Sequence, residues 1–229
     1  MTSLTPDEIE ALLLSLKISS VAVIGALPFA AATALILSRS FRGRILLDGI
    51  VQLPLVLPPV AMGFILLTIF GTRSGVGAFL KDQFGIVLVF RWTGAMLASA
   101  IFTFPFQVRA IRQALEAQDT GLDEAARTLG AGWLDRLINV TLPLALPGLV
   151  AGAITAFAGS LGEFGAIITF VSNIPGETRT LPLAIYTALQ TPGGEAEAAR
   201  LSALSIVLAF LFLIAAQAIM RRATADRER

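Results

Sequence analysis

The sequence has no cysteine and no histidine among its 229 residues, and only 14% of them are charged. Without cysteine there is no disulfide framework and no thiolate metal site, and without histidine the commonest imidazole ligand and acid–base group is missing. No phosphate-binding G-x-x-x-x-G-K-[ST] motif occurs, so we expect no ATP hydrolysis by this chain alone. The net charge is +1, and no acidic or basic tail indicates a nucleic-acid partner. Catalytic residues, a metal site and a bound cofactor are therefore not expected.

Apolar residues are abundant instead, at 55% of the chain. Five apolar runs approach the roughly 20 residues that cross a bilayer. They cover about residues 11–37, 45–70, 92–108, 142–160 and 201–220. We therefore predict an all-α fold, a polytopic transmembrane helical bundle of about five long spans in a single domain, 1–229. The acidic start MTSLTPDEIE is unlike a signal peptide, so the first run is expected to remain as a span.

Positive charges indicate the orientation of this bundle, because short loops rich in lysine and arginine stay in the cytoplasm. Eleven of the 17 Lys and Arg residues fall in one set of alternate segments, and six fall in the other. The larger set is Arg39, Arg42, Arg44, Arg109, Arg112, Arg127, Arg136, Arg221, Arg222, Arg227 and Arg229. We therefore predict a multi-pass protein of the cell inner membrane, with a periplasmic N-terminus and a cytoplasmic C-terminus.

Two local patterns refine the predicted bundle. The apolar stretch Leu181–Gln190 has ten residues, which reach only about 15 Å as a helix, so we expect a short helix at the outer surface. In the fourth run, Gly148 and Gly152 have the G-x-x-x-G spacing that permits close contact between helices.

A polar segment, residues 112–141, separates the third and fourth runs. Thr120 and Asp123 resemble a capping box at the start of a helix near Gly121. The residues at the i, i+3, i+4 and i+7 positions then form one apolar face. They are Leu122, Ala125, Ala126 and Leu129. Gly130 predicts a left-handed stop before a second amphipathic turn. A small, flat helical face of this kind is suited to a groove in another protein.

This segment resembles the cytoplasmic EAA loop of permease subunits of ATP-binding-cassette (ABC) importers. The resemblance lies in Glu124, Ala125 and Ala126, then Gly130, then Val140–Pro143, with valine where isoleucine is usual. It implies the ABC importer type I permease fold, with a coupling helix that docks into a cleft of a separate ATP-binding subunit. The residues that it assigns to this coupling are Glu124, Ala125, Ala126, Leu129, Gly130, Leu142 and Pro143.

Longer stretches are similar to the molybdate permease subunit within this family. They are LPLVLPPVAMG (53–63), RTLGAG (127–132), SLGEFGAIITFVSNIPGETRTLPLAIY (160–186) and QTPGGEAEAARL (190–201). The resemblance implies a non-catalytic homodimer with two ATP-binding cassette subunits, which use ATP and Mg, and a periplasmic molybdate-binding protein. Sulfate and thiosulfate permeases share the GEFG-like part, and tungstate nearly equals molybdate in size and charge. These substrates remain alternatives.

A lone carboxylate, Glu163, interrupts the end of the fourth run between Gly162 and Phe164. Charges inside membrane segments usually mark function or satisfy buried backbone groups. A carboxylate in the path of an anion would repel it, so we expect Glu163 to hold backbone N–H groups or Arg179. Gly162, Glu163, Phe164 and Gly165 are predicted to form a gate or a docking region for the binding protein.

Few charged groups lie deep in the spans, so hydroxyl groups are the main candidates for polar groups in a pore. They are Thr68, Ser99, Thr103, Thr155, Ser160 and Thr169. Such a path would bind an anion weakly, so substrate selection is expected in the binding protein. Two other classes of function remain as alternatives. A secondary transporter would need an ionisable site near the midplane, for which Glu163 is the candidate, and a structural membrane protein would have no transport role.

Overall fold

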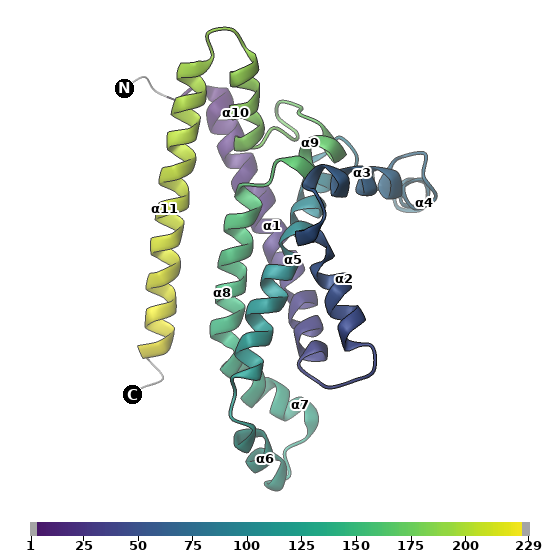
Figure 1. Cartoon of the computed structure of the whole chain (residues 1–229), viewed down its shortest axis with the longest axis vertical. Helices are drawn as coiled ribbons and strands as arrows, with labels where there is room; N and C mark the ends of the chain where they lie inside the picture. Colours follow the sequence, from purple (N-terminus) through teal and green to yellow (C-terminus); the bar gives the residue numbers. More distant parts are fainter. Residues whose placement is uncertain (1–3, 226–229) are drawn as a thin grey trace.

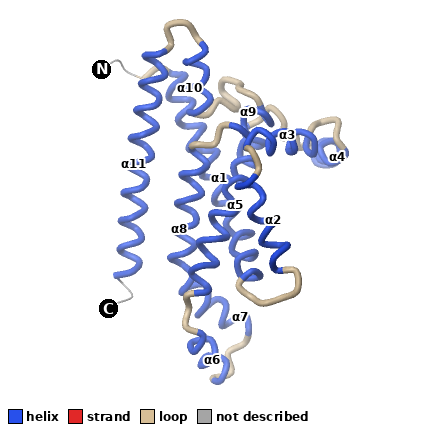
Figure 2. Tube along the Cα trace, viewed as in Figure 1, coloured by secondary structure: helices blue, strands red, loops and turns tan. Residues whose placement is uncertain are grey.

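The computed structural model describes residues 4–225, which fold into eleven α-helices and one π-helix without a β-strand (Figures 1 and 2). The elements are α1 (Pro6–Leu37), α2 (Arg44–Val56), α3 (Pro59–Phe70), α4 (Gly75–Phe84), α5 (Trp92–Glu116), α6 (Thr120–Thr128), α7 (Trp133–Arg136), the π-helix η1 (Leu137–Thr141), α8 (Leu142–Leu161), α9 (Gly165–Val171), α10 (Leu181–Gln190) and α11 (Glu195–Ala225). The predicted all-α class is confirmed.

Helix α5 is the central element, packed between α1 and α8 (Figure 1). On α1, Ala22, Ala26, Ala30 and Ala34 recur at every fourth position, and all four are buried. Residues four apart share one face of a helix, so these alanines form a flat strip that brings the backbones of neighbouring helices close together. Helix α2 lies beside α5, and α11 runs along α8 and α10 at the edge of the bundle.

The connections gather at two opposite ends of the bundle (Figure 1). One end, called the α10 end, contains the start of α1 together with α3, α4, α9 and α10. The other, called the α6 end, contains the α1–α2 loop, α6, α7 and the end of α11. Helix α1, α5, the continuous stretch Trp133–Leu161 and α11 are each long and apolar enough to cross a membrane. They make four candidate crossings, or five if the bent pair α2–α3 counts as one span, and the chain is a multi-pass membrane protein.

The second apolar run, predicted as one span over 45–70, is bent by 111° between α2 and α3. Leu57 and Pro58 adopt extended backbone at the bend, because a residue that precedes proline is disfavoured in the helical region. The 13 residues of α2 reach only about 20 Å, which is short of the roughly 30 Å of hydrocarbon. Helix α3 instead lies across the α10 end, where it packs against α9.

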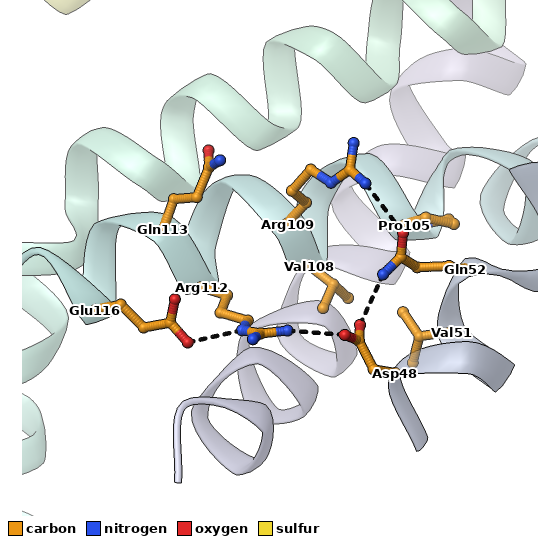
Figure 3. Close-up of a pocket in the computed structure, with 9 residues that line it drawn as sticks. All are labelled: Asp48, Val51, Gln52, Pro105, Val108, Arg109, Arg112, Gln113 and Glu116. Carbon is orange, nitrogen blue, oxygen red and sulfur yellow. Dashed lines mark hydrogen bonds and ion pairs between the residues drawn. The ribbon is translucent and has the colours of Figure 1, made fainter. Parts of the chain in front are cut away.

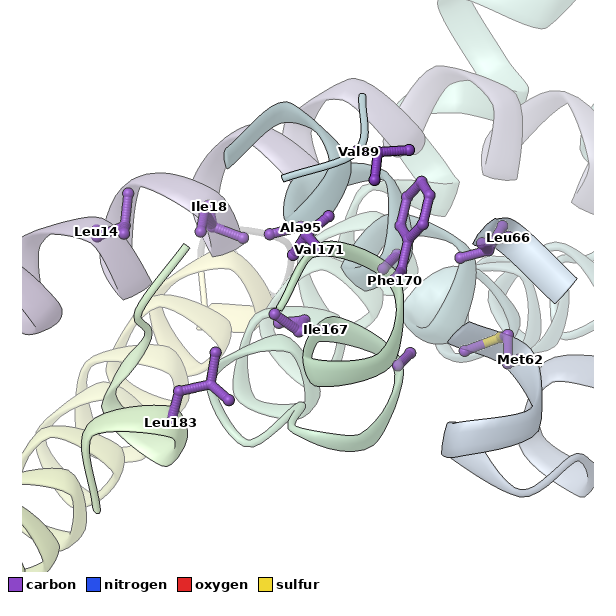
Figure 4. Packing of buried hydrophobic residues seen from close by; sticks show 12 residues of the cluster. Leu14, Ile18, Met62, Leu66, Val89, Ala95, Ile167, Phe170, Val171 and Leu183 are labelled. Carbon is purple, nitrogen blue, oxygen red and sulfur yellow. The ribbon is translucent and has the colours of Figure 1, made fainter. Parts of the chain in front are cut away.

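Helix α9 is the centre of a buried apolar cluster at the α10 end (Figure 4). Ile167 and Phe170 of α9 are fully buried and share this cluster with Ile18 of α1. Helix α3 can approach because Gly63 has no side chain, and a Cβ there would lie 2.6 Å from the carbonyl oxygen of Ala166. The two short helices α3 and α9 are therefore packed as one layer over the bundle.

Two spans extend beyond their apolar runs because their charged residues have partners. Helix α1 begins before residue 11, where Thr5 and Glu8 form a capping box and Glu8 pairs with Arg200 of α11 at 2.6 Å. Helix α5 continues past residue 108, where Arg112 and Glu116 pair at 2.8 Å. The short helix predicted for residues 181–190 is α10.

Gly148 and Gly152 lie where α8 crosses α5 at close range. A Cβ on Gly148 would lie 2.4 Å from the Cβ of Ala114 and 2.8 Å from the carbonyl oxygen of Ala110. A Cβ on Gly152 would lie 3.1 Å from the Cα of Gln107. The G-x-x-x-G spacing therefore serves the contact between α8 and α5 inside this chain.

We predict that Gly148→Ala destabilises the fold, because the added methyl group overlaps Ala114 and the backbone of Ala110. Overpacking typically costs about 1 to 3 kcal/mol, so the thermal midpoint of the detergent-solubilised protein should fall. Gly159→Ala is the matched control on the same helix, since its Cβ would lie 3.4 Å from the nearest atom of Phe106. Equal midpoints for the two variants would contradict the close contact.

Candidate functional site

The segment 112–141 projects beyond the ends of α5 and α8 at the α6 end (Figure 1). It contains the last turn of α5, then α6, α7 and η1, which leads directly into α8. The π-helical turn η1 precedes Pro143, which has no N–H to continue the usual ladder. The helix, corner and second helix predicted from the sequence are all present.

The start of α6 differs from the predicted capping box. Asp119, not Thr120, is the N-cap, and its Oδ1 accepts a hydrogen bond from the N–H of Gly121 at 2.9 Å. A helix that begins at Thr120 puts Asp119 in the capping position, one residue before the predicted cap. The side chain of Thr120 lies outside the described residues. Asp123 instead receives Arg136 Nη1 at 2.7 Å, which joins α6 to α7.

The end of α6 is a Schellman motif centred on Gly130. The N–H of Ala131 donates to the Ala126 carbonyl at 3.0 Å, and the N–H of Gly130 donates to the Arg127 carbonyl at 3.1 Å. Gly130 has φ +87°, a conformation that favours glycine. The predicted left-handed stop is therefore present and turns the chain back toward α8.

The predicted apolar face of α6 is largely exposed in the part of the chain that the structure describes. Leu129 is 88% exposed and Leu122 is 50% exposed, and Ala125 is also exposed while Ala126 is half-buried. Trp133, at 55% exposure, extends the same apolar end of the molecule. Exposed apolar patches of this kind mark interaction sites in proteins.

The other predicted coupling residues lie in two places. Glu124 is exposed on α6, and Gly130 is exposed at its end. Leu142 and Pro143 lie in the first turn of α8, where Leu142 is half-buried. Gln118 connects the two ends of the segment 112–141, since its Nε2 donates to the Thr141 carbonyl at 3.1 Å. These contacts hold α6 against the end of α5 and the start of α8.

Glu163 lies at the opposite end, in the joint between α8 and α9, and is 4% exposed. Its Oε1 accepts a hydrogen bond from the backbone N–H of Ala166 at 2.8 Å, so the expected backbone partner is found in the first turn of α9. Arg179 was the alternative partner, but its Nε donates to Asn173 Oδ1 at 3.0 Å. The carboxylate thus accepts a hydrogen bond from a buried N–H group at the start of α9.

The neighbours of Glu163 contact three different elements. Gly162 is the exposed C-cap of α8. The ring of Phe164 lies 5.2 Å from the ring of Tyr186 in α10. A Cβ on Gly165 would lie 2.7 Å from the Cβ of Pro59, so Gly165 allows α3 to meet α9. The four predicted gate residues therefore lie at the place where α3, α8, α9 and α10 come together.

Most of the hydroxyl groups proposed for a pore bond to their own helices. Thr103 Oγ1 donates to the Ser99 carbonyl at 2.8 Å, and Thr155 Oγ1 donates to the Ala151 carbonyl at 2.8 Å. Thr68 and Thr169 make the same bond four residues back. Ser160 instead donates to Ser19 of α1 at 2.9 Å. These bonds occupy the donors of five of the six hydroxyls, whereas Ser99 Oγ is buried without a hydrogen-bond partner among the described residues.

A polar cluster between α2 and α5 was not predicted from the sequence (Figure 3). Arg112 lies between Glu116, at 2.8 Å, and Asp48 of α2, at 3.1 Å. Glu116 Oε1 also accepts from Arg44 at 2.9 Å. The signal in the sequence is a pair of polar positions four apart, Asp48 and Gln52, inside an apolar run.

We predict that Glu163→Ala lowers stability by about 1 to 2 kcal/mol, because it leaves the buried N–H of Ala166 without its acceptor. Glu163→Gln keeps a side-chain oxygen and should retain most of the stability. Thermal unfolding of the two purified variants measures the difference. A Glu163→Ala protein that unfolds at the parent temperature would disprove the capping role.

Comparison with known proteins identifies relatives over nearly the whole chain. The chain is 55% identical over 219 residues to the molybdenum transport system permease protein ModB of Escherichia coli (strain K12), covering 95% of this chain and 96% of that protein. It is 47% identical over 216 residues to ModB of Haemophilus influenzae, covering 94% of each. It is 39% identical over 186 residues to the sulfate transport system permease protein CysT of Salmonella typhimurium, covering 80% of this chain and 67% of that protein.

Solved structures of transporters share the fold. A bacterial ABC transporter involved in alginate import matches with a TM-score of 0.76 at 20% identity, covering 96% of this chain and 80% of that chain. The MetNI methionine ABC transporter matches with a TM-score of 0.72 at 19% identity, covering 94% and 95%. Residues 26–227 match the sequence family of binding-protein-dependent transport system inner membrane components. The chain therefore belongs to this family of transporter permeases.

Proposed function

We propose that the chain is the permease subunit of an ATP-driven ABC importer that moves molybdate across the inner membrane. The identity of 55% to the E. coli molybdenum permease, over 95% of the chain, carries this proposal. The exposed apolar face of α6 on a transporter permease fold supports it independently. The subunit conducts the anion, and catalysis belongs to a partner.

The proposed assembly is a homodimer of this chain with two ATP-binding cassette subunits and a periplasmic molybdate-binding protein. ATP and Mg²⁺ are used by the cassette subunits. The α6 end faces the cytoplasm in this proposal, because it contains the α1–α2 loop, the segment 112–141 and the end of α11, which belong to the alternate segments that are richer in positive charge. The N-terminus then faces the periplasm, and the binding protein docks at the α10 end.

The fold suggests how a movement of the cassette subunits reaches the α10 end. The Asp123–Arg136 pair and the Gln118–Thr141 bond hold α6 against the end of α5 and the start of α8. Helices α5 and α8 touch at Gly148, so we infer that they move as one unit. At its far end α8 meets the Glu163 joint, where α9 and α3 begin. A tilt of this unit would therefore shift the layer over the α10 end.

Sulfate and thiosulfate remain the second candidate substrates, because the chain is 39% identical to a sulfate permease. The higher identity to molybdenum permeases favours molybdate. Tungstate has the same charge and nearly the same size, so the two anions are expected to share this path.

Uptake of labelled molybdate into vesicles that contain the full complex tests the proposal. We expect uptake to require ATP and the binding protein, and to be reduced by unlabelled molybdate or tungstate more than by equal sulfate. Uptake that continues without ATP would disprove the ATP-driven mechanism and favour a secondary transporter. Competition by sulfate alone would reassign the substrate.

We predict that Ala126→Trp and Gly130→Val either release the cassette subunits or leave their ATP hydrolysis uncoupled from transport. This chain should still insert into the membrane and form dimers. The tryptophan overlaps the groove wall, and valine is strained at φ +87°. Overlap at a packed interface costs about 1 to 3 kcal/mol, or roughly a 5- to 150-fold loss of affinity. Copurification of the cassette subunit and molybdate uptake are measured together.

Gly132→Val is the matched control for this prediction. Gly132 lies in the same corner with φ −68°, and a Cβ there would meet no atom within 4 Å. We expect this variant to retain the bound cassette subunit and the uptake. Parental binding and uptake in Ala126→Trp and Gly130→Val would remove the assignment of α6 as the coupling helix.

A further inference from the structure

A cavity of about 210 Å³ opens between α2 and α5 (Figure 3). The middle of α2 and the last part of α5, which line it, lie nearer the α6 end (Figure 1). Its lining is mainly polar, from Asp48, Gln52, Arg109, Arg112, Gln113 and Glu116. A single ordered water needs only about 15 Å³, so the cavity has room for a small hydrated ion. Polar groups in this number do not suit contact with lipid.

The positive charges that line or border this cavity are not all compensated. Arg112 pairs with Asp48 and Glu116, and Arg44 shares Glu116. Arg109 Nη2 instead donates to the neutral amide oxygen of Gln52 at 3.0 Å. Among the side chains that the structure describes, no carboxylate forms an ion pair with Arg109. The three guanidinium groups and two carboxylates therefore leave one positive charge in excess, on Arg109.

The position of Arg109 indicates water or protein beside it. It lies about 10 Å along α5 from the last residue, Glu116, and directly after the apolar run 92–108. A charge at the edge of an apolar span is costly if it is turned to lipid, and it normally faces water or another protein. Arg109 is exposed in the single chain, so we infer that the surface around it faces water or protein.

The geometry around Arg109 has the donors that an oxyanion needs. Gln52 is itself held by Asp48, since its Nε2 donates to Asp48 Oδ1 at 2.9 Å, and this bond presents the Gln52 oxygen to Arg109. Gln113 is one turn further along α5 and projects to the same side as Arg109 (Figure 3). Guanidinium N–H groups match the oxygen atoms of oxyanions, and an amide NH₂ adds further donors.

We propose that Arg109 and Gln113 form a low-affinity site for a tetrahedral oxyanion near the α6 end of the path, with Gln52 as a positioning residue. The proposal rests on the function proposed above and adds the place where the anion is held before release. Water around the exposed Arg109 screens its charge, so binding is weak and exit is easy. The compensated Arg112 has a different role, because it joins α2 to α5.

Direct binding of molybdate to the complex of this chain with its cassette subunits in nanodiscs tests the site. The binding protein is left out, because it would bind the anion itself. The molybdenum NMR line of free molybdate is narrow because the ion is symmetric, and binding to an asymmetric site broadens it. We expect the parent complex to broaden the line at millimolar molybdate and Arg109→Gln to bind about tenfold more weakly, because charge-assisted hydrogen bonds are lost. Arg109→Lys should retain part of the affinity, because it keeps the charge but loses the fork.

Arg42→Gln is the matched control, since Arg42 is an exposed arginine in the α1–α2 loop at the same end of the molecule. It removes the same charge, and it should leave the broadening unchanged. If the proposal is wrong, the Arg109→Gln complex will broaden the line as much as the parent does, or will lose no more broadening than the Arg42→Gln complex. A parent complex that does not broaden the line would also overturn it.

Uptake by the same variants, measured with the binding protein added, separates this proposal from the proposed function. Slower uptake by Arg109→Gln than by Arg42→Gln, with both copies and both cassette subunits still copurifying, supports the site. No uptake by the parent would contradict the molybdate importer, while the NMR comparison still decides the role of Arg109. Loss of the dimer in Arg109→Gln alone would show that Arg109 contacts the second copy and would overturn the anion site.

Discussion

The close contact of α5 with α1 and α8 is the constraint on which the other parts of the structure depend. Lipid gives helices little hydrophobic reason to associate, so small residues that let backbones approach must hold them together. Gly148 and Gly152 provide this on α8, and the buried alanine strip provides it on α1. Because α5 leads into α6 and α8 follows η1, the same contact holds both ends of the segment 112–141 in place.

Buried polar groups complete this packing, because the hydrocarbon has no water to satisfy them. Ser15 accepts a bond from the N–H of Leu181 at 2.7 Å, which attaches α10 to α1. The Ser19–Ser160 bond joins α1 to α8, and Gln107 Nε2 donates to the Val23 carbonyl of α1 at 3.3 Å. Each bond links segments far apart in the sequence, so these residues fix the order of the helices as well as their contact.

Features that depend on neighbouring residues could be predicted from the sequence. The number of apolar runs follows from composition, and the turn at Gly130 follows from the freedom of glycine to adopt positive φ. Glu163 could be given a backbone partner because a carboxylate so placed commonly caps a helix. Tertiary features could not be predicted. Pro58 and Pro59 indicate a break between α2 and α3, but its angle of 111° depends on where α3 packs against α9.

The cluster around Arg112 and Arg109 shows the same limit, since its contacts between α2 and α5 join residues 57 to 72 positions apart in the chain. The carboxylates at the two ends also differ in their partners. At the α10 end, the carboxylates of Glu163 and Glu177 are directed to helix starts, where Glu177 accepts from the N–H of Trp92 at 3.5 Å. These carboxylates are engaged by backbone donors, whereas the cluster at the α6 end has a guanidinium in excess. An anion that passes the apolar middle of the bundle would therefore meet a guanidinium without a carboxylate partner close to its exit, where water can take it up.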